Sequence, residues 1–131
     1  MKIAVDTNVL VRAAVRDDAE QTDIATKLMR RAEIVAIAVS SLCEFVWVLR
    51  HVYRFRSEDM ANAIRTVVAA KNVETNWLAV EAGLAMLDAG GDFADGAIAY
   101  EGRWLGGETF VSFDKKAVVM LTAQGQAARL L

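Results

Sequence analysis

Residues 34–39 read IVAIAV, a continuous run of apolar and largely β-branched side chains that decides the fold class of this chain. A strand that is apolar at every position suits burial on both faces, which is typical of a parallel sheet. Segments with helical character flank this run, over residues 17–33 before it and from Ser40 to about Tyr53 after it. The stretch therefore predicts a buried parallel strand between two helices.

The same alternation continues along the rest of the chain. Further strands are expected at residues 2–6, 109–113 and 126–131, and a brief strand or a loop at 72–75. Further helices are expected at residues 7–14, from Ser57, at 76–87, 92–102 and 115–121. Strands that alternate with helices imply right-handed crossovers and an α/β fold, in which a parallel sheet carries helices on both faces. No linker or repeat interrupts residues 1–131, so a single domain is expected.

Composition narrows the class of protein further. Hydrophobic residues make up 55% of the 131 residues and the mean hydropathy is +0.27, which is more apolar than one small core needs. Part of the surface is therefore expected to cover a partner, in a homo-oligomer or with a binding protein. The formal net charge of −2 argues against broad electrostatic coating of nucleic acid, but not against a nuclease that reaches phosphate through metal ions.

The sequence also indicates where the protein works. No apolar run has the length of a transmembrane helix, and the first residues lack the apolar core and cleavage site of a signal peptide. Cys43 is the single cysteine, so an intrachain disulfide is impossible. We expect a cytoplasmic protein without a membrane partner.

Acidic residues stand where the expected strands end or the expected helices begin. They are Asp6, Glu44, the pair Asp92 and Asp95, and Asp114. In open α/β sheets, sites form beyond the carboxyl ends of the strands, which is where Asp6 and Asp114 are expected. Carboxylates that converge there repel one another unless a divalent cation such as Mg²⁺ or Mn²⁺ joins them. Such a site can cut phosphodiesters.

Each of these acids also has a simpler structural interpretation. Asp6, Asp92 and Asp114 can cap the helices that follow them, and residues 41–44 match a capping box in which Glu44 reaches back to Ser41. Asp95 lies one turn inside its helix and is followed by small residues that permit close packing against a sheet, so a functional role is favoured for it. For the others both interpretations stay open.

A basic and aromatic segment follows Glu44. Arg50, Arg54 and Arg56 interleave with Tyr53 and Phe55, a pattern that can hold RNA phosphates and stack bases. A solvated helix end, favourable to the helix dipole, or a docking point for an acidic protein explains it equally well. The only histidine, His51, and the three tryptophans are expected to serve packing, surface or interface roles.

Taken together, four short motifs resemble the PIN-domain family, and within it the VapC-type toxins of bacterial toxin–antitoxin pairs. The motifs read VDTNVL at residues 5–10, SLCEF at 41–45, DFADGAIA at 92–99 and FVSFDK at 110–115. They span essentially the whole chain in the family's order and spacing. Each motif alone is weak, whereas the set is specific.

The resemblance implies a three-layer α/β/α sandwich with a central parallel sheet and a metal-dependent endoribonuclease activity that uses Mg²⁺ or Mn²⁺. The family's metal-binding quartet maps onto Asp6, Glu44, Asp95 and Asp114. Asp92 matches a frequent additional acid, and Thr7 and Ser112 match hydroxyl positions beside the metal. Gly96 and Tyr100 depart from the sizes that many relatives have at these positions, which affects packing more than chemistry.

Partners are also implied by the resemblance: a homodimer, an inhibitory cognate antitoxin, and a structured RNA substrate such as tRNA. Two other classes of function remain. One is an α/β phosphohydrolase or phospho-acceptor domain, although residues 6–8 lack the second aspartate of the common Asp-x-Asp signature. The other is a non-catalytic PIN-like module that binds RNA or protein.

Overall fold

The computed structural model describes all residues from Met1 to Leu131. The chain folds into two compact units, Met1–Asn76 and Trp77–Leu131, each with its own parallel strands and its own buried side chains. Seven helices and two sets of parallel strands confirm the predicted α/β class. None of the helices combines the length and apolar character that crossing a bilayer requires.

The first unit is built around a three-stranded parallel sheet in the order β1-β2-β3. Its elements are β1 Lys2–Ala4, α1 Thr7–Val15, α2 Ala19–Arg31, β2 Ile34–Ala36, α3 Val39–His51, α4 Ser57–Val68 and β3 Val73–Glu74. In the register, Val35 at the centre of β2 lies opposite Ile3 on one side and Val73 on the other. Val35 is fully buried, whereas Ile34 is intermediate and Ala36 is exposed, so burial alternates along β2 and the predicted burial on both faces is wrong.

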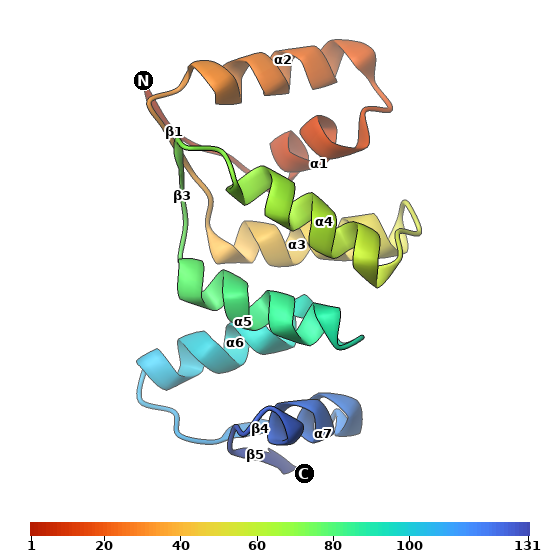
Figure 1. Cartoon of the computed structure of the whole chain (residues 1–131), viewed down its shortest axis with the longest axis vertical. Coiled ribbons are helices and arrows are strands. Elements are labelled where there is room, and N and C mark those ends of the chain that lie inside the picture. The colour runs from red at the N-terminus through yellow and green to blue at the C-terminus, as the bar shows by residue number, and fades with distance from the viewer. The chain divides into compact units, whose positions relative to one another are not determined.

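The core of the first unit lies where its helices meet. Leu42, Phe45, Val46 and Leu49 repeat at helical spacing on α3 and are all buried. The helix α3 packs beside both α1 and α4, and α2 packs beside α1 (Figure 1). Burial of this stripe holds the start of α3, and with it Glu44, in place.

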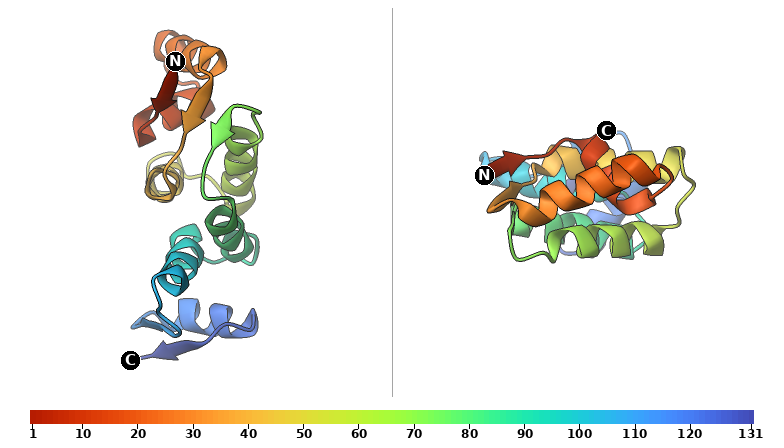
Figure 2. Two further views of the ribbon diagram at one scale, coloured as in Figure 1. Left: turned by 90° about the vertical axis from the view of Figure 1, so that its left-hand side faces the viewer. Right: turned by 90° about the horizontal axis from the view of Figure 1, so that it is seen from above.

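The second unit contains two helices followed by a small two-stranded parallel sheet. Its elements are α5 Trp77–Asp88, α6 Phe93–Trp104, β4 Phe110–Ser112, α7 Lys115–Ala123 and β5 Ala128–Leu130. Figure 2 shows α5 beside α6, and α7 beside β4 and β5. A buried cluster of Met86, Ala99 and Leu121 joins these elements, with Phe110 and Ala128 packed against it.

Two glycines bring α5 and α6 into close contact. A Cβ atom at Gly96 would lie 2.2 Å from the carbonyl oxygen of Ala82, and one at Gly83 would lie 2.5 Å from the ring of Phe93. Real side chains do not tolerate either distance. The approach of α5 therefore requires glycine at position 96, while Ala99 on the same helix packs toward the small sheet.

Some local predictions are wrong. The helix α3 begins at Val39 after Ala38, which caps it without a side-chain hydrogen bond, so Ser40 and Ser41 are not its caps. The run at residues 34–39 is accordingly split, because only residues 34–36 pair as a strand.

Candidate functional site

Asp6 lies directly after β1 and caps α1. Its Oδ1 accepts a hydrogen bond of 3.3 Å from the backbone N–H of Val9, and its backbone is extended, as a cap requires. The capping interpretation is therefore correct for Asp6. The cap does not prevent Asp6 from binding a metal, because it uses Oδ1 of the carboxylate and leaves Oδ2 available.

Glu44 is oriented by Thr7 rather than by its own helix. The Thr7 hydroxyl donates a hydrogen bond of 2.7 Å to Oε2 of Glu44, which lies in the second turn of α3. The predicted capping box between Ser41 and Glu44 is wrong, because Ser41 lies inside the helix. The first unit thus brings Asp6, Thr7 and Glu44 together at the start of α1, since Thr7 directly follows Asp6.

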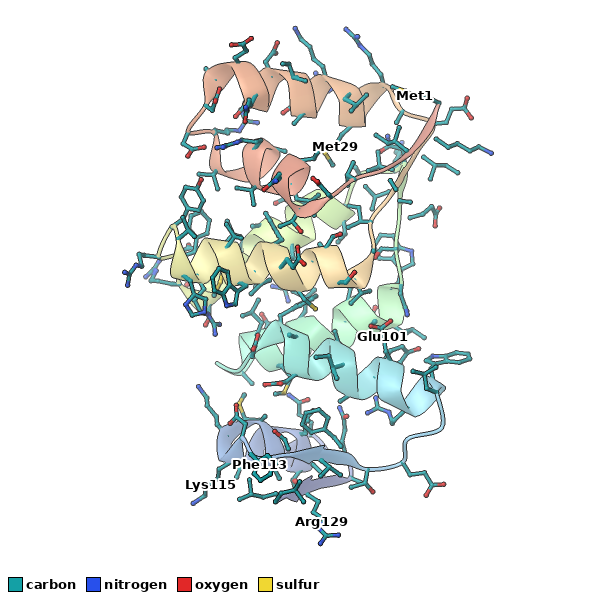
Figure 3. The ribbon with its side chains drawn as sticks, turned by 180° about the vertical axis from the view of Figure 1, so that it is seen from behind. Met1, Met29, Glu101, Phe113, Lys115 and Arg129 are labelled. Atoms are coloured by element: carbon teal, nitrogen blue, oxygen red, sulfur yellow. The ribbon has the colours of Figure 1, made fainter.

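In the second unit, two acids cap helices as the simpler interpretation predicts. Asp92 accepts from the backbone N–H of Ala94 at 3.2 Å at the start of α6, and Asp114 accepts from that of Ala117 at 3.2 Å at the start of α7. Ser112 orients the second cap, because its Oγ accepts a hydrogen bond of 2.9 Å from the backbone N–H of Asp114. Figure 3 labels Phe113 and Lys115, which flank Asp114 between β4 and α7.

Burial and neighbouring negative charges both act on the carboxyl group of Asp95 in this unit. Its carboxyl group is half-buried in the first turn of α6, and burial is the largest cause that raises its pKa above the usual value. The negative charges of Asp92 and Asp114 raise this pKa further. Asp92 and Asp114 therefore lie close enough to Asp95 for their negative charges to disfavour its ionised form.

The predicted quartet is divided between the units. Asp6 and Glu44 belong to the first unit, and Asp95 and Asp114 to the second. In neither unit do three acidic, histidine or cysteine side chains gather closely enough to hold a metal ion. The donors present are carboxylate and hydroxyl oxygens, which are the ligands that Mg²⁺ and Mn²⁺ prefer. The chemistry of this donor set fits the predicted ion.

The predicted basic residues lie at and beyond the end of α3. Arg50 is in its last turn, Arg54 follows it with a left-handed backbone (φ 59°), and Arg56 pairs with Asp59 at 3.3 Å. The structure adds a feature that the sequence did not predict: the rings of Trp47 and His51 lie in contact at a centroid distance of 4.7 Å, with their planes tilted by 39°. Their spacing of four residues on a helix is the signal that was available in the sequence.

A second missed cluster ties the loop after α1 to the end of α3. The hydroxyl of Tyr53 donates to Oδ2 of Asp17 at 2.9 Å, and Arg12 Nη1 donates to Oδ1 at 3.0 Å. The hydrogen bond from Tyr53 is the main cause that lowers the pKa of Asp17. No sequence signal predicts this cluster, because Tyr53 and Asp17 are 36 residues apart.

A hollow of about 530 Å³ in the first unit is separate from the acids. Residues of α1, α2, α4, β2 and β3 line it, among them Arg16, Met29 and Val67, whereas Asp6 and Glu44 do not. It is therefore not part of the candidate site.

Comparison with known families agrees with the motifs. The family model of the PIN domain matches residues 3–118, which is most of the chain and includes all four acids of the predicted quartet. No curated protein matched the chain.

Proposed function

The chain belongs to the PIN-domain family, which is generally a family of metal-dependent nucleases, and from that premise we propose that it is a Mg²⁺- or Mn²⁺-dependent endoribonuclease. The observation that carries the proposal is the family match over residues 3–118, which includes Asp6, Glu44, Asp95 and Asp114. The setting of Asp95 supports it: burial first, and the charges of Asp92 and Asp114 next, raise the pKa of this carboxyl group. A raised carboxyl pKa of this kind is common at functional sites.

We assign the metal to the carboxylates of Asp6, Glu44, Asp95 and Asp114. Thr7 supports the site by orienting Glu44, and Ser112 supports it by holding the backbone of Asp114. Asp92 adds charge beside Asp95. Hydrogen bonds that orient a ligand from behind commonly change metal affinity by about 10- to 100-fold, so these residues are part of the proposed site.

The proposed reaction is hydrolysis by water without a side-chain nucleophile. The bound ion supplies Lewis acidity, which makes water more acidic and stabilises charge on the phosphate. The water oxygen forms a bond to phosphorus, the bond from phosphorus to the 3′ oxygen breaks, and that oxygen takes up a proton. The products then carry 5′-phosphate and 3′-hydroxyl ends. The role of the residues of this chain is to position the ion. Three of the four acids lie at helix caps or in the first turn of a helix, where the backbone holds them.

We further propose the biological setting of a VapBC-type toxin, with a cognate antitoxin, a homodimeric assembly, a tRNA-like substrate and a cytoplasmic location. The motif set and the surplus of apolar residues support it. Large apolar side chains such as Val52, Leu105 and Phe113 are exposed, which suits a chain that buries surface against partners. Arg50, Arg54 and Arg56 are proposed contacts to RNA or to the antitoxin.

Cleavage of total bacterial RNA by the purified protein tests the enzyme proposal. Reactions with Mg²⁺, Mn²⁺ and EDTA are compared for the native protein, Asp6→Asn and Asp18→Asn. Asp18 is a matched control, because it caps α2 as Asp6 caps α1, through a hydrogen bond of 3.0 Å from Gln21. Asparagine caps helices about as well as aspartate, so loss of a cap does not explain any difference between the two variants.

The expected result is metal-dependent cleavage that Asp6→Asn abolishes and Asp18→Asn retains. Equal cleavage by Asp6→Asn would remove Asp6 from the site. A folded, metal-binding protein that cuts no RNA would favour a non-catalytic binding module instead. A phosphoryl group on an aspartate, detected by mass spectrometry, would favour a phospho-acceptor domain.

A further inference from the structure

An exposed aromatic pair on α3 has no role in the core. The side chain of Trp47 is 59% exposed, and its ring lies 4.7 Å from that of His51, with an angle of 39° between the two planes. The other face of α3 carries the buried stripe, so the pair does not support the packing of the unit. The two rings are tilted against each other, so each presents its own exposed apolar face, and the face of an exposed tryptophan suits another planar group.

The segment that carries this pair is rich in arginine although the whole chain is acidic. Residues 45–57 contain Arg50, Arg54 and Arg56 and no aspartate or glutamate, whereas the net charge of the chain is −2. Acidic residues border this segment, and one of them, Asp59, pairs with Arg56, so the exposed Arg54 is the arginine that the proposal uses. Arg54 is exposed, and its left-handed backbone turns the chain away from the end of α3. Aromatic rings with arginines beside them are what single-stranded nucleic acids bind, through their bases and their phosphates respectively.

The pair is also close to a proposed metal ligand. Trp47 and His51 follow Glu44 by three and seven residues, so all three lie on one side of α3, about 5 and 10 Å apart along its axis. Nucleotides that flank a phosphate held at Glu44 would reach these rings. This placement distinguishes Trp47 from Trp104, which is exposed on α6 of the other unit.

We propose that Trp47 and His51 form a stacking platform for a base of single-stranded RNA, next to the phosphate that is cut. The identity of the polymer rests on the proposed nuclease function, and the platform itself rests on the aromatic pair and its arginines. A second copy of this chain is a poorer occupant. Two such faces in contact would bring the arginine-rich segments of both copies, including the exposed Arg54, to one interface, where like charges are unfavourable.

The test measures RNA binding without cleavage. A fluorescein-labelled single-stranded RNA 12-mer is titrated in Mg²⁺ by anisotropy against the Asp6→Asn protein and against the same protein with Trp47→Ala, Trp47→Phe or Trp104→Ala. Trp104 is the matched control, because its side chain is 73% exposed. Loss of one base stack corresponds to an increase in Kd of about ten-fold. We expect that increase for Trp47→Ala, and little change for Trp47→Phe and Trp104→Ala.

Tryptophan fluorescence gives a second readout that a structural role would not produce. In a protein with Trp77→Phe and Trp104→Phe, Trp47 is the only tryptophan, and stacking of a base should quench its emission as RNA is added. Unchanged emission at saturating RNA would overturn the platform. A Kd for the Trp47→Ala protein equal to that of its Asp6→Asn parent would also overturn the platform. The absence of measurable RNA binding by the Asp6→Asn parent would do the same.

The outcomes separate this inference from the nuclease proposal. If the native protein cuts no RNA but binding still depends on Trp47, the platform stands and the nuclease proposal fails. If the native protein cuts RNA and Trp47→Ala binds it normally, the nuclease stands and the platform fails. If Trp47→Ala changes the sedimentation of the protein without changing RNA affinity, the face is a contact between copies and the platform is overturned.

Discussion

The hydroxyl of Thr7 donates a hydrogen bond of 2.7 Å to the carboxylate of Glu44 across 37 residues of the chain. Thr7 is the first residue of α1 and is only 9% exposed, so its side chain has a defined position. The bond fixes the start of α1 against α3. It also determines which way one carboxylate of the proposed site points.

Thr7→Val removes this hydrogen bond while it preserves shape, and Thr7→Ser keeps the hydroxyl. We expect Thr7→Val to raise the Mg²⁺ concentration needed for half-maximal cleavage by about 10-fold, because Glu44 loses its orienting donor. Thr7→Ser should restore most of the affinity. A metal titration of the cleavage rate measures both. Equal metal dependence of Thr7→Val and the native protein would show that the bond is purely structural.

Asp95→Asn should stabilise the metal-free protein at neutral pH, although it is expected to abolish cleavage. The pKa of Asp95 is raised, by burial first and by Asp92 and Asp114 next, so the folded state disfavours its ionised form. That destabilisation is absent below the ordinary pKa of 3.8, develops as the pH rises, and is complete above the raised pKa. Asparagine has no negative charge and therefore removes this destabilisation.

Urea unfolding in EDTA at pH 7 and at pH 3 measures this effect. Asp95→Asn should be more stable than the native protein at pH 7 and should lose that advantage at pH 3. Glu101→Gln is the control, because Glu101 is an exposed acid on the same helix (Figure 3). If Asp95→Asn is less stable at pH 7 in EDTA, charge crowding at this position is disproved.

Gly96→Ala should strongly destabilise the second unit. The new Cβ would lie 2.2 Å from the backbone oxygen of Ala82, which cannot move aside as a flexible side chain can, and a cost of about 3 kcal/mol is expected. Gly102→Ala is the matched control on α6, because a Cβ there meets nothing within 4 Å. It should raise the free energy of unfolding by roughly 0.5–1 kcal/mol, since alanine favours the helix. Chemical denaturation measures both, and similar effects of the two changes would contradict the close approach of α5 and α6.

Tyr53→Phe should return the pKa of Asp17 toward its ordinary value. The hydrogen bond from Tyr53 is the main cause that lowers this pKa, and Arg12 contributes less. The corresponding stability is present above the ordinary pKa of Asp17 and is lost as the pH falls through its lowered value. An NMR titration of the Asp17 carboxyl in both proteins measures the change. No upward movement of the pKa in Tyr53→Phe would leave Arg12 as the effective partner.

Most of the elements were predictable because local signals agree with the tertiary fold. The apolar stripe on α3, the caps Asp92 and Asp114, and the glycines that end α5 are all visible as residue types at fixed spacing. The start of α3 was not predictable from these signals, because Ser40 and Ser41 look like helix caps. In the structure, burial of Val39 and Leu42 places the start of the helix at Val39 instead.

The sequence by itself determined the α/β class, the positions of the acids at element ends, and the membership of the PIN-domain family. These follow from the types of residue and their spacing along the chain, which can be read without knowledge of the tertiary structure. Only the tertiary structure decided that Thr7 orients Glu44, that Asp17 joins Tyr53, and that Asp92 and Asp114 raise the pKa of Asp95. Hydrogen bonds and charge interactions depend on distances of a few ångströms between residues remote in the chain, and only folding sets those distances.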